Sequence, residues 1–221
     1  MSKLYIVATP IGNLSDITLR ALETLKSVDL ILCEDTRVSK KLMDNYDIKT
    51  KLMSYHQHSN KSKVNLLLDK LKSGMDMALI TDAGTPGISD PGNKFIEEAV
   101  EYAEVIPMPG PSAVATALSI AGMPTDKFLF LGFIPHKKGR ETLFNRINES
   151  KETVVFYEST HRIIKTLERL NELLDKKRKV VVCRELTKKF ETIYRGNMES
   201  VLKQLKDSTT KGEFVVIISG K

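Results

Sequence analysis

The sequence contains no tryptophan and only two cysteines among its 221 residues, and aromatic residues make up 6% of it. Cys33 and Cys183 lie far apart in apolar stretches, so we expect two buried thiols, with no disulfide framework and no paired metal-ligand spacing. The low aromatic content leaves no evident platform on which nucleobases could stack. Recognition of a nucleic acid by base stacking alone is therefore not expected.

Long hydrophobic runs are also missing. No apolar stretch approaches the length of a membrane-spanning helix, and the N-terminus lacks the charged and then apolar pattern of a signal peptide. Residues 4–8 instead predict the first strand of a fold. With 41% hydrophobic and 28% charged residues, the composition is that of an ordinary globular protein. We expect a cytoplasmic protein that has no membrane partner.

Several common motifs for nucleotides and catalysis are absent. There is no Gly-x-x-x-x-Gly-Lys-Ser/Thr, and the turn at 9–13 reads Thr-Pro-Ile-Gly-Asn in place of Gly-x-Gly-x-x-Gly. Glu34 and Asp35 end a predicted strand where a dinucleotide fold carries its ribose-binding acid, but without the glycines this signal is weak. His56 and His58 could share one face of a strand, yet no third and fourth ligand can be placed, so no metal is expected.

Short apolar segments alternate with helical patterns through the first half of the chain. The segment 64–71, for example, carries apolar side chains at i, i+3, i+4 and i+7, which is typical of an amphipathic helix. This alternation predicts an α/β fold with a mostly parallel sheet covered by helices on both faces.

A break in the pattern at 121–125, Ala-Gly-Met-Pro-Thr, predicts a domain boundary. We therefore expect an N-terminal α/β domain at 1–121 and a C-terminal mixed α/β domain at 122–221. In the second domain, residues 180–185 and 190–196 have the pattern of two strands of a hairpin, which predicts an antiparallel component in its sheet.

The densest cluster of glycine and proline, Asp82 to Gly92, directly follows the apolar segment 77–81. Glycines allow positive φ and a close approach of a ligand to the backbone, while prolines stiffen the loop. Asp90 is a good N-cap and Pro91 suits the first helical position, so a helix is expected to begin at once. An ordinary turn between strand and helix needs only one glycine and a cap, so this density favours a ligand-binding loop.

Basic residues give the chain a net charge of +6 and gather in three clusters, at 136–140, 176–179 and 188–189. Each cluster alone is more often a solvated loop than a binding site. Because all three lie in one half of the chain, together they favour a polyanionic partner such as a nucleic acid.

Four motifs in the first half resemble the tetrapyrrole methylase superfamily. They are Thr-Pro-Ile-Gly-Asn-Leu at 9–14, Cys-Glu-Asp-Thr-Arg at 33–37, the Asp82–Gly92 loop and Pro-Gly-Pro-Ser-Ala at 109–113. Phe-Tyr-Glu-Ser-Thr-His-Arg at 156–162 and Cys-Arg-Glu-Leu-Thr-Lys at 183–188 are similar to one branch, which methylates the ribose 2′-O of a cytidine in 16S ribosomal RNA of the small subunit. The resemblance covers essentially the whole chain. It implies a homodimer of two-domain subunits that bind S-adenosylmethionine in a cleft between the domains.

The resemblance also implies a cofactor site built from loops at strand ends. The residues that match the family's contacts are Pro10, Thr81, Asp82, Ala83, Gly84, Ile88, Ser89, Ser112, Ala113, Tyr157 and Glu213, with Phe214 as the alternative to Glu213. The chain departs from the tetrapyrrole-modifying branches at 83–85, where it has Ala-Gly-Thr and they carry Gly-Asp-Pro. This departure puts the side-chain contacts in doubt but leaves the backbone cradle as an expectation.

Methyl transfer from a sulfonium needs no metal, because the enzyme mainly has to align the methyl group with the attacking oxygen and exclude water. A base or a cation that lowers the pKa of the ribose hydroxyl should help, and general-base assistance is worth about 10²–10⁴-fold. Our catalytic candidates are charged residues near strand ends: Glu158 and Glu185 to accept the proton, and Arg184 and Lys188 to hold a neighbouring phosphate. Alternatively, these residues form ion pairs with one another at a domain interface. The candidate RNA contacts are Arg37, Lys137, Lys138, Arg140 and Arg162.

Two other functions stay open. One keeps the fold and the cofactor but transfers the methyl group to a carbon of a tetrapyrrole, which the basic clusters and the missing Gly-Asp-Pro disfavour. The other is a non-catalytic RNA-binding assembly factor that keeps a cofactor site for stability, which the intact loop disfavours.

Overall fold

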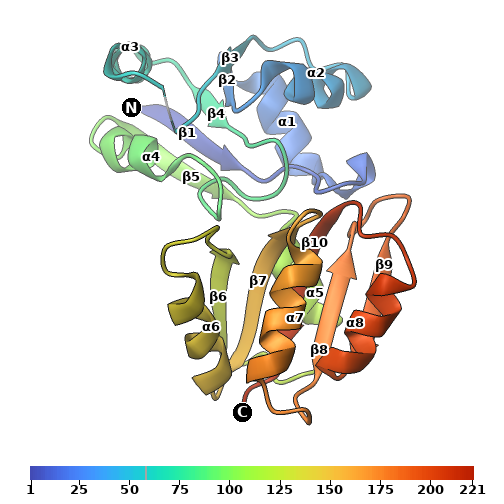
Figure 1. Cartoon of the computed structure of the whole chain (residues 1–221). Coiled ribbons are helices and arrows are strands. Elements are labelled where there is room, and N and C mark those ends of the chain that lie inside the picture. The colour runs from blue at the N-terminus through green and yellow to red at the C-terminus, as the bar shows by residue number, and fades with distance from the viewer. Residues whose placement is uncertain (58) are drawn as a thin grey trace. The chain divides into compact units, whose positions relative to one another are not determined.

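The computed structural model describes residues 1–57 and 59–221. They form two compact units, Met1–Ser112 and Ala113–Lys221, and Figure 1 labels the helices and strands of each. The expected boundary at residue 121 lies beyond the helix α5 (Ala113–Ser119), which packs against strands of the second unit. A break in composition marks the loop after this helix, whereas the chain enters the second unit just before it.

Unit 1 contains a sheet of five parallel strands in the order β3-β2-β4-β1-β5. The strands are β1 (Ser2–Val7), β2 (Leu30–Cys33), β3 (Leu52–Ser54), β4 (Met77–Leu79) and β5 (Ala103–Met108). The helices are η1 (Leu14–Asp16), α1 (Leu19–Ser27), α2 (Thr36–Asn45), α3 (Lys61–Lys72) and α4 (Asn93–Ala99). The expected parallel sheet is confirmed.

Strand β2 shows how both faces of this sheet are covered. Leu30 and Leu32 belong to a core cluster with residues of α3 and α4, while Ile31 and Cys33 belong to one with residues of α1 and α2. Alternate side chains of a strand point to opposite faces, so a strand buried on both sides must be apolar throughout. This explains the uninterrupted apolar run Leu-Ile-Leu-Cys.

The start of α4 differs from the expectation. The helix begins at Asn93 and not at Pro91, and its N-cap is Gly92, with φ of 144°. Asn93 donates its side-chain amide to the carbonyl oxygen of Gly87 at 3.2 Å, which ties the helix start to the preceding loop. The prediction that Asp90 caps the helix was wrong, because residues 90–92 still belong to the loop and the helix begins only after them.

Unit 2 contains a mixed sheet in the order β6-β7-β10-β8-β9, in which β6 and β7 are parallel and the other pairs antiparallel. The strands are β6 (Phe128–Phe133), β7 (Thr153–Ser159), β8 (Val180–Arg184), β9 (Thr192–Gly196) and β10 (Glu213–Ile218). The mixed sheet and the β8–β9 hairpin are as predicted.

The faces of the second sheet are covered unequally. Helices α6 (Arg140–Glu149), α7 (Ile163–Leu173) and α8 (Met198–Lys206) pack on one face and share its main core, whereas α5 contacts β7 and β10 and adds nothing to that core (Figure 1). Both cysteines of the chain are buried free thiols, as expected. Within the described ranges, no helix is both long and apolar enough to cross a membrane.

Candidate active site

Three loops that follow β1, β4 and β5 are tied together at the carboxyl edge of the first sheet. Thr9 and Gly84 exchange two backbone hydrogen bonds, at 2.9 and 3.0 Å. The buried Thr9 hydroxyl donates to the carbonyl oxygen of Thr81 at 3.0 Å, and the Thr85 hydroxyl donates to that of Pro111 at 3.1 Å. Cofactors of open α/β sheets bind at this edge. The predicted residues Pro10, Thr81, Asp82, Ala83, Gly84 and Ser112 lie in these loops.

Glycines make this close approach possible. Gly84 has φ of +85°, a left-handed conformation that disfavours any residue with a Cβ atom. At Gly110 a Cβ would lie 3.0 Å from the Cβ of Ala8, so a larger residue would crowd the contact between the loop after β5 and the end of β1. Ser89 adopts positive φ (64°) without being glycine, and such strain concentrates at ligand sites. The loop therefore presents its backbone in a fixed shape.

Carboxylates give the same edge a negative character. The backbone N–H of Asp35 donates to Asp82 at 3.1 Å. Partial desolvation raises the pKa of Asp82, and desolvation together with the Asp82 charge raises the pKa of Glu34. The side chain of Arg37, a predicted RNA contact, is 89% exposed and pairs with Asp35 at 2.6 Å, which lowers the pKa of Asp35 to about 2. This edge therefore favours a ligand that carries positive charge.

In unit 2, Lys188 bridges two carboxylates at the ends of β8 and β10. Its ammonium nitrogen lies 3.0 Å from Glu185 Oε1 and 2.7 Å from Glu213 Oε2. Desolvation raises the pKa of Glu185, but hydrogen bonds from the Glu213 N–H and from Lys188 outweigh it and lower that pKa. Desolvation likewise opposes the charge of Lys188, yet the two carboxylates prevail and raise the lysine's pKa. The cluster thus holds a charged, partly exposed ammonium group.

Arg184, the other predicted phosphate ligand, is buried and engaged with the backbone. Its guanidinium group donates to the carbonyl oxygens of Lys211 at 2.6 Å and Phe190 at 3.1 Å. These bonds join the turn after β8 to the turn before β10. The buried side chain therefore holds together the two turns next to Lys188 and Glu213.

Glu158 lies inside unit 2, with a side chain that is 0% exposed. One carboxylate oxygen accepts from the Ser159 N–H and pairs with Arg162, both at 2.8 Å. The other oxygen accepts from the Thr166 hydroxyl at 2.7 Å. Both oxygens are thus satisfied within the unit. The ion pair of Glu158 thus lies inside unit 2, and each of its carboxylate oxygens already has a partner there.

The same network holds the loop between β6 and α6. Arg162 donates to the carbonyl oxygen of Ile134 at 2.6 Å, and Arg140 donates to that of Pro135 at 3.2 Å and to the Thr166 hydroxyl at 2.7 Å. The two arginines are engaged with this loop, whereas Lys137 and Lys138 at its tip are exposed. Among the described residues, no ion pair involves either lysine.

Sequence reasoning missed an aromatic cluster at the end of β6. Phe130 and Phe133 both pack against Tyr157, and their ring centroids lie 5.1 and 5.4 Å, respectively, from that of Tyr157. A glycine inside an apolar strand, here Gly132, is the signal that could have indicated an irregularity.

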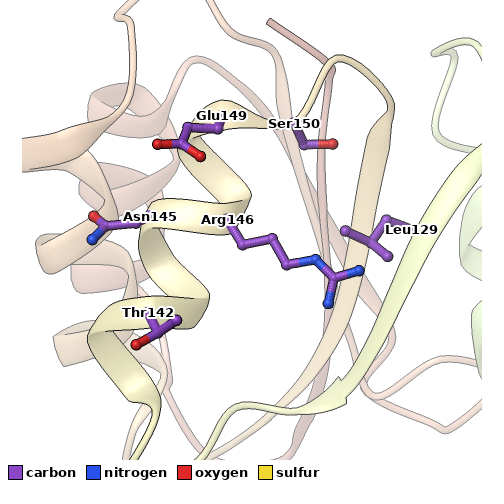
Figure 2. A pocket seen from close by; sticks show the side chains of 6 residues that line it. All are labelled: Leu129, Thr142, Asn145, Arg146, Glu149 and Ser150. Atoms are coloured by element: carbon purple, nitrogen blue, oxygen red, sulfur yellow. The ribbon is translucent and has the colours of Figure 1, made fainter.

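A surface hollow of about 470 Å³ in unit 2 is lined by Leu129 and by residues of α6 and its C-cap. Figure 2 shows the Arg146 side chain extending across it toward Leu129. None of the predicted site residues lines it, so we assign the candidate site to the loops and not to this hollow. As for metals, His58 lies outside the described residues, and those residues contain no group of three or more His, Cys, Asp or Glu side chains suited to an ion.

A parallel sheet with three joined strand-end loops, followed by a mixed sheet, agrees with the family indicated by the sequence. The chain belongs to the tetrapyrrole (corrin/porphyrin) methylases, whose family model matches residues 3–202. Ribosomal RNA small subunit methyltransferase I of Halalkalibacterium halodurans is 47% identical over 219 residues, covering 98% of this chain and 75% of that protein. Its counterpart from Escherichia coli O157:H7 is 46% identical over 222 residues, covering 99% and 78%. A crystal structure of diphthine synthase, at 12% identity, shares the fold with a TM-score of 0.76, covering 99% of this chain and 90% of that one.

Proposed function

We propose that this chain uses S-adenosylmethionine to methylate the ribose 2′-O of a cytidine in 16S ribosomal RNA. The observation that carries the proposal is the joined Thr9–Gly84 loop pair, in a chain 47% identical to a ribosomal RNA small subunit methyltransferase I. The 2′-O-cytidine specificity is supported by the resemblance of segments 156–162 and 183–188 to that branch. Such an RNA is modified where ribosomes assemble, in the cytoplasm, and the resemblance favours a homodimer.

The loops of unit 1 suit this cofactor. Bound S-adenosylmethionine supplies an electrophilic methyl group on a positively charged sulfur. The backbone around Gly84 can approach a ligand closely, and the carboxylates of Asp82 and Glu34 provide a negative field for a cation. We place the cofactor against Pro10, residues 81–84 and 88–89, and Ser112 with Ala113. The contributions of Tyr157 and Glu213 remain predictions from the resemblance.

For the RNA that accepts the methyl group, we assign a catalytic role to Lys188. Its ammonium group is partly exposed and held by Glu185 and Glu213, so it is charged and oriented before substrate binds. Such a cation lowers the pKa of a nearby ribose hydroxyl or holds an adjacent phosphate. Glu185 is a weak base, because the same contacts lower its pKa. We therefore assign Glu185 to positioning the lysine.

Lys137 and Lys138 are suited to hold RNA phosphates. They are exposed at the tip of a loop whose base is fixed by Arg140 and Arg162. A fixed loop presents its charges at low entropic cost, and phosphate contacts of this kind orient RNA without reading its sequence.

The test is methyl transfer to small ribosomal subunits from cells that lack this modification. Labelled S-adenosylmethionine is supplied, the RNA is digested to nucleosides, and the product is identified by mass spectrometry. We expect 2′-O-methylcytidine at one position. No incorporation by protein that binds the cofactor would overturn the proposal; transfer to a tetrapyrrole would then indicate the first alternative, and RNA binding without transfer the second.

A further inference from the structure

Strand β6 contains a bulge just before its end. Phe130 pairs with Val155 and Phe133 pairs with Tyr157, so three steps along β6 match two along β7. Gly132, inside this bulge, has φ of +61°. In a regular strand, residues three apart face opposite sides of the sheet. The extra residue brings Phe130 and Phe133 to the same side, and bulges that redirect a side chain in this way are frequent beside functional sites.

The redirected ring of Phe133 is held but not buried. It packs edge-on to Tyr157, at 5.4 Å between ring centroids and 63° between ring planes, while Tyr157 packs similarly with Phe130. Phe133 nevertheless remains 53% exposed. From the same strand, Leu129 and Leu131 pack against the main core of unit 2. Phe133 is therefore a ring that is held by Tyr157, lies outside the main core of unit 2 and leaves about half of its surface exposed.

Positive charge follows directly in the chain. The loop after β6 carries the exposed Lys137 and Lys138, and its base is fixed through Arg140 and Arg162, as described above. Single-stranded nucleic acids are commonly held by this combination, in which aromatic rings stack on bases and cations contact phosphates. Because the relatives of this chain are named ribosomal RNA methyltransferases, RNA is the partner that we infer for this combination.

We propose that Phe133 is a stacking surface for an unpaired nucleobase of the RNA substrate, with Lys137 and Lys138 on neighbouring phosphates. The inference rests on the proposed function, and it adds one stacked base to an interaction that the low aromatic content predicts not to depend on stacking alone. It also gives the bulge a role, since a regular strand would turn this ring to the opposite face.

The test compares three substitutions of Phe133 with one matched control. Phe133→Ala removes the ring, Phe133→Leu keeps apolar bulk without aromaticity, and Phe133→Trp enlarges the stacking surface. Phe128→Ala is the control, because Phe128 is also exposed (44%) and lies on the same strand at its other end. The readouts are KM for small ribosomal subunits, affinity for S-adenosylmethionine by calorimetry, and molecular mass by light scattering.

We expect the alanine and leucine variants to raise KM for the subunits at least about fivefold. This factor corresponds to the smallest loss of binding that is typical when one stacked base is lost. The tryptophan variant and Phe128→Ala should resemble the wild type, and cofactor affinity and mass should not change. An unchanged KM in the alanine and leucine variants, lost cofactor affinity or an altered mass would each overturn the inference; the last two would assign the ring to the cofactor or to a subunit contact. If the wild-type protein transfers no methyl group, the proposed function itself fails and this inference falls with it.

Discussion

Thr9 and Gly84 exchange two backbone hydrogen bonds, at 2.9 and 3.0 Å, and so join the loops after β1 and β4 into one element. Because both partners are backbone groups, the contact depends on backbone shape more than on side-chain identity. This explains how the chain can depart from Gly-Asp-Pro at 83–85 and still join these two loops.

Substitution of Gly84 by alanine tests whether this backbone shape holds the cofactor. Alanine in a left-handed conformation costs about 1–2 kcal/mol, and relief of that strain would shift the loop. We expect Gly84→Ala to weaken S-adenosylmethionine binding about tenfold or more by calorimetry. Gly74→Ala is the control, because Gly74 also has positive φ (+94°) and a Cβ there would meet nothing within 4 Å. Equal cofactor affinity in both variants would contradict the backbone cradle.

The buried position of Glu158 predicts a large effect on stability. Glu158→Ala would leave Arg162 without its carboxylate partner, and breaking a buried pair in this way costs about 3–5 kcal/mol in the free energy of unfolding. Glu141→Ala, which removes an exposed partner of Arg169 at 2.7 Å, should cost only about 0–1 kcal/mol. Urea unfolding of both variants provides the measurement.

A second substitution separates structure from catalysis at this position. Glu158→Gln keeps the shape of the side chain, so the folded fraction of this variant should retain kcat within about tenfold of the wild type. If this variant folds normally but loses about 10²–10⁴-fold in kcat, Glu158 is the general base after all.

The cluster around Lys188 predicts the opposite pattern. Its ion pairs are partly exposed, so Lys188→Ala should change unfolding free energy by about 1 kcal/mol or less. If the ammonium group stabilises developing charge on the ribose oxygen, kcat should fall by about 10²–10³-fold. Lys189→Ala, at the exposed neighbouring position, should leave kcat unchanged. Comparable kcat values for the two variants would remove Lys188 from the chemistry.

Salt dependence tests the loop that carries Lys137 and Lys138. Each lost phosphate contact on single-stranded RNA lowers the slope of log affinity against log salt by about 0.7. The double variant K137A/K138A should therefore bind small ribosomal subunits with a slope reduced by about 1.4. The pair K176A/K177A, in another exposed basic cluster, serves as the control. The same slope in both double variants would show that the β6–α6 loop does not contact phosphate.

Local patterns in the sequence determined the fold class and the family. Apolar segments such as Leu30–Cys33 predict buried strands because their side chains must be apolar on both faces. The strand-end motifs resemble those of the methylase family, and the family model that matches residues 3–202 confirms this resemblance. The β8–β9 hairpin follows from the same local reasoning, since its strands are close in the chain.

Tertiary structure alone decided what the charged and aromatic side chains do. In the sequence, Arg140 and Arg162 are basic residues like Lys137 and Lys138. In the structure, both arginines are bound to other groups of unit 2, including Glu158, whereas the two lysines are exposed. The face on which Phe133 lies likewise depends on a bulge whose register is set by pairing with Tyr157. The physical reason is that partners distant in the chain determine burial, pairing and register, and no local pattern records which of them will meet.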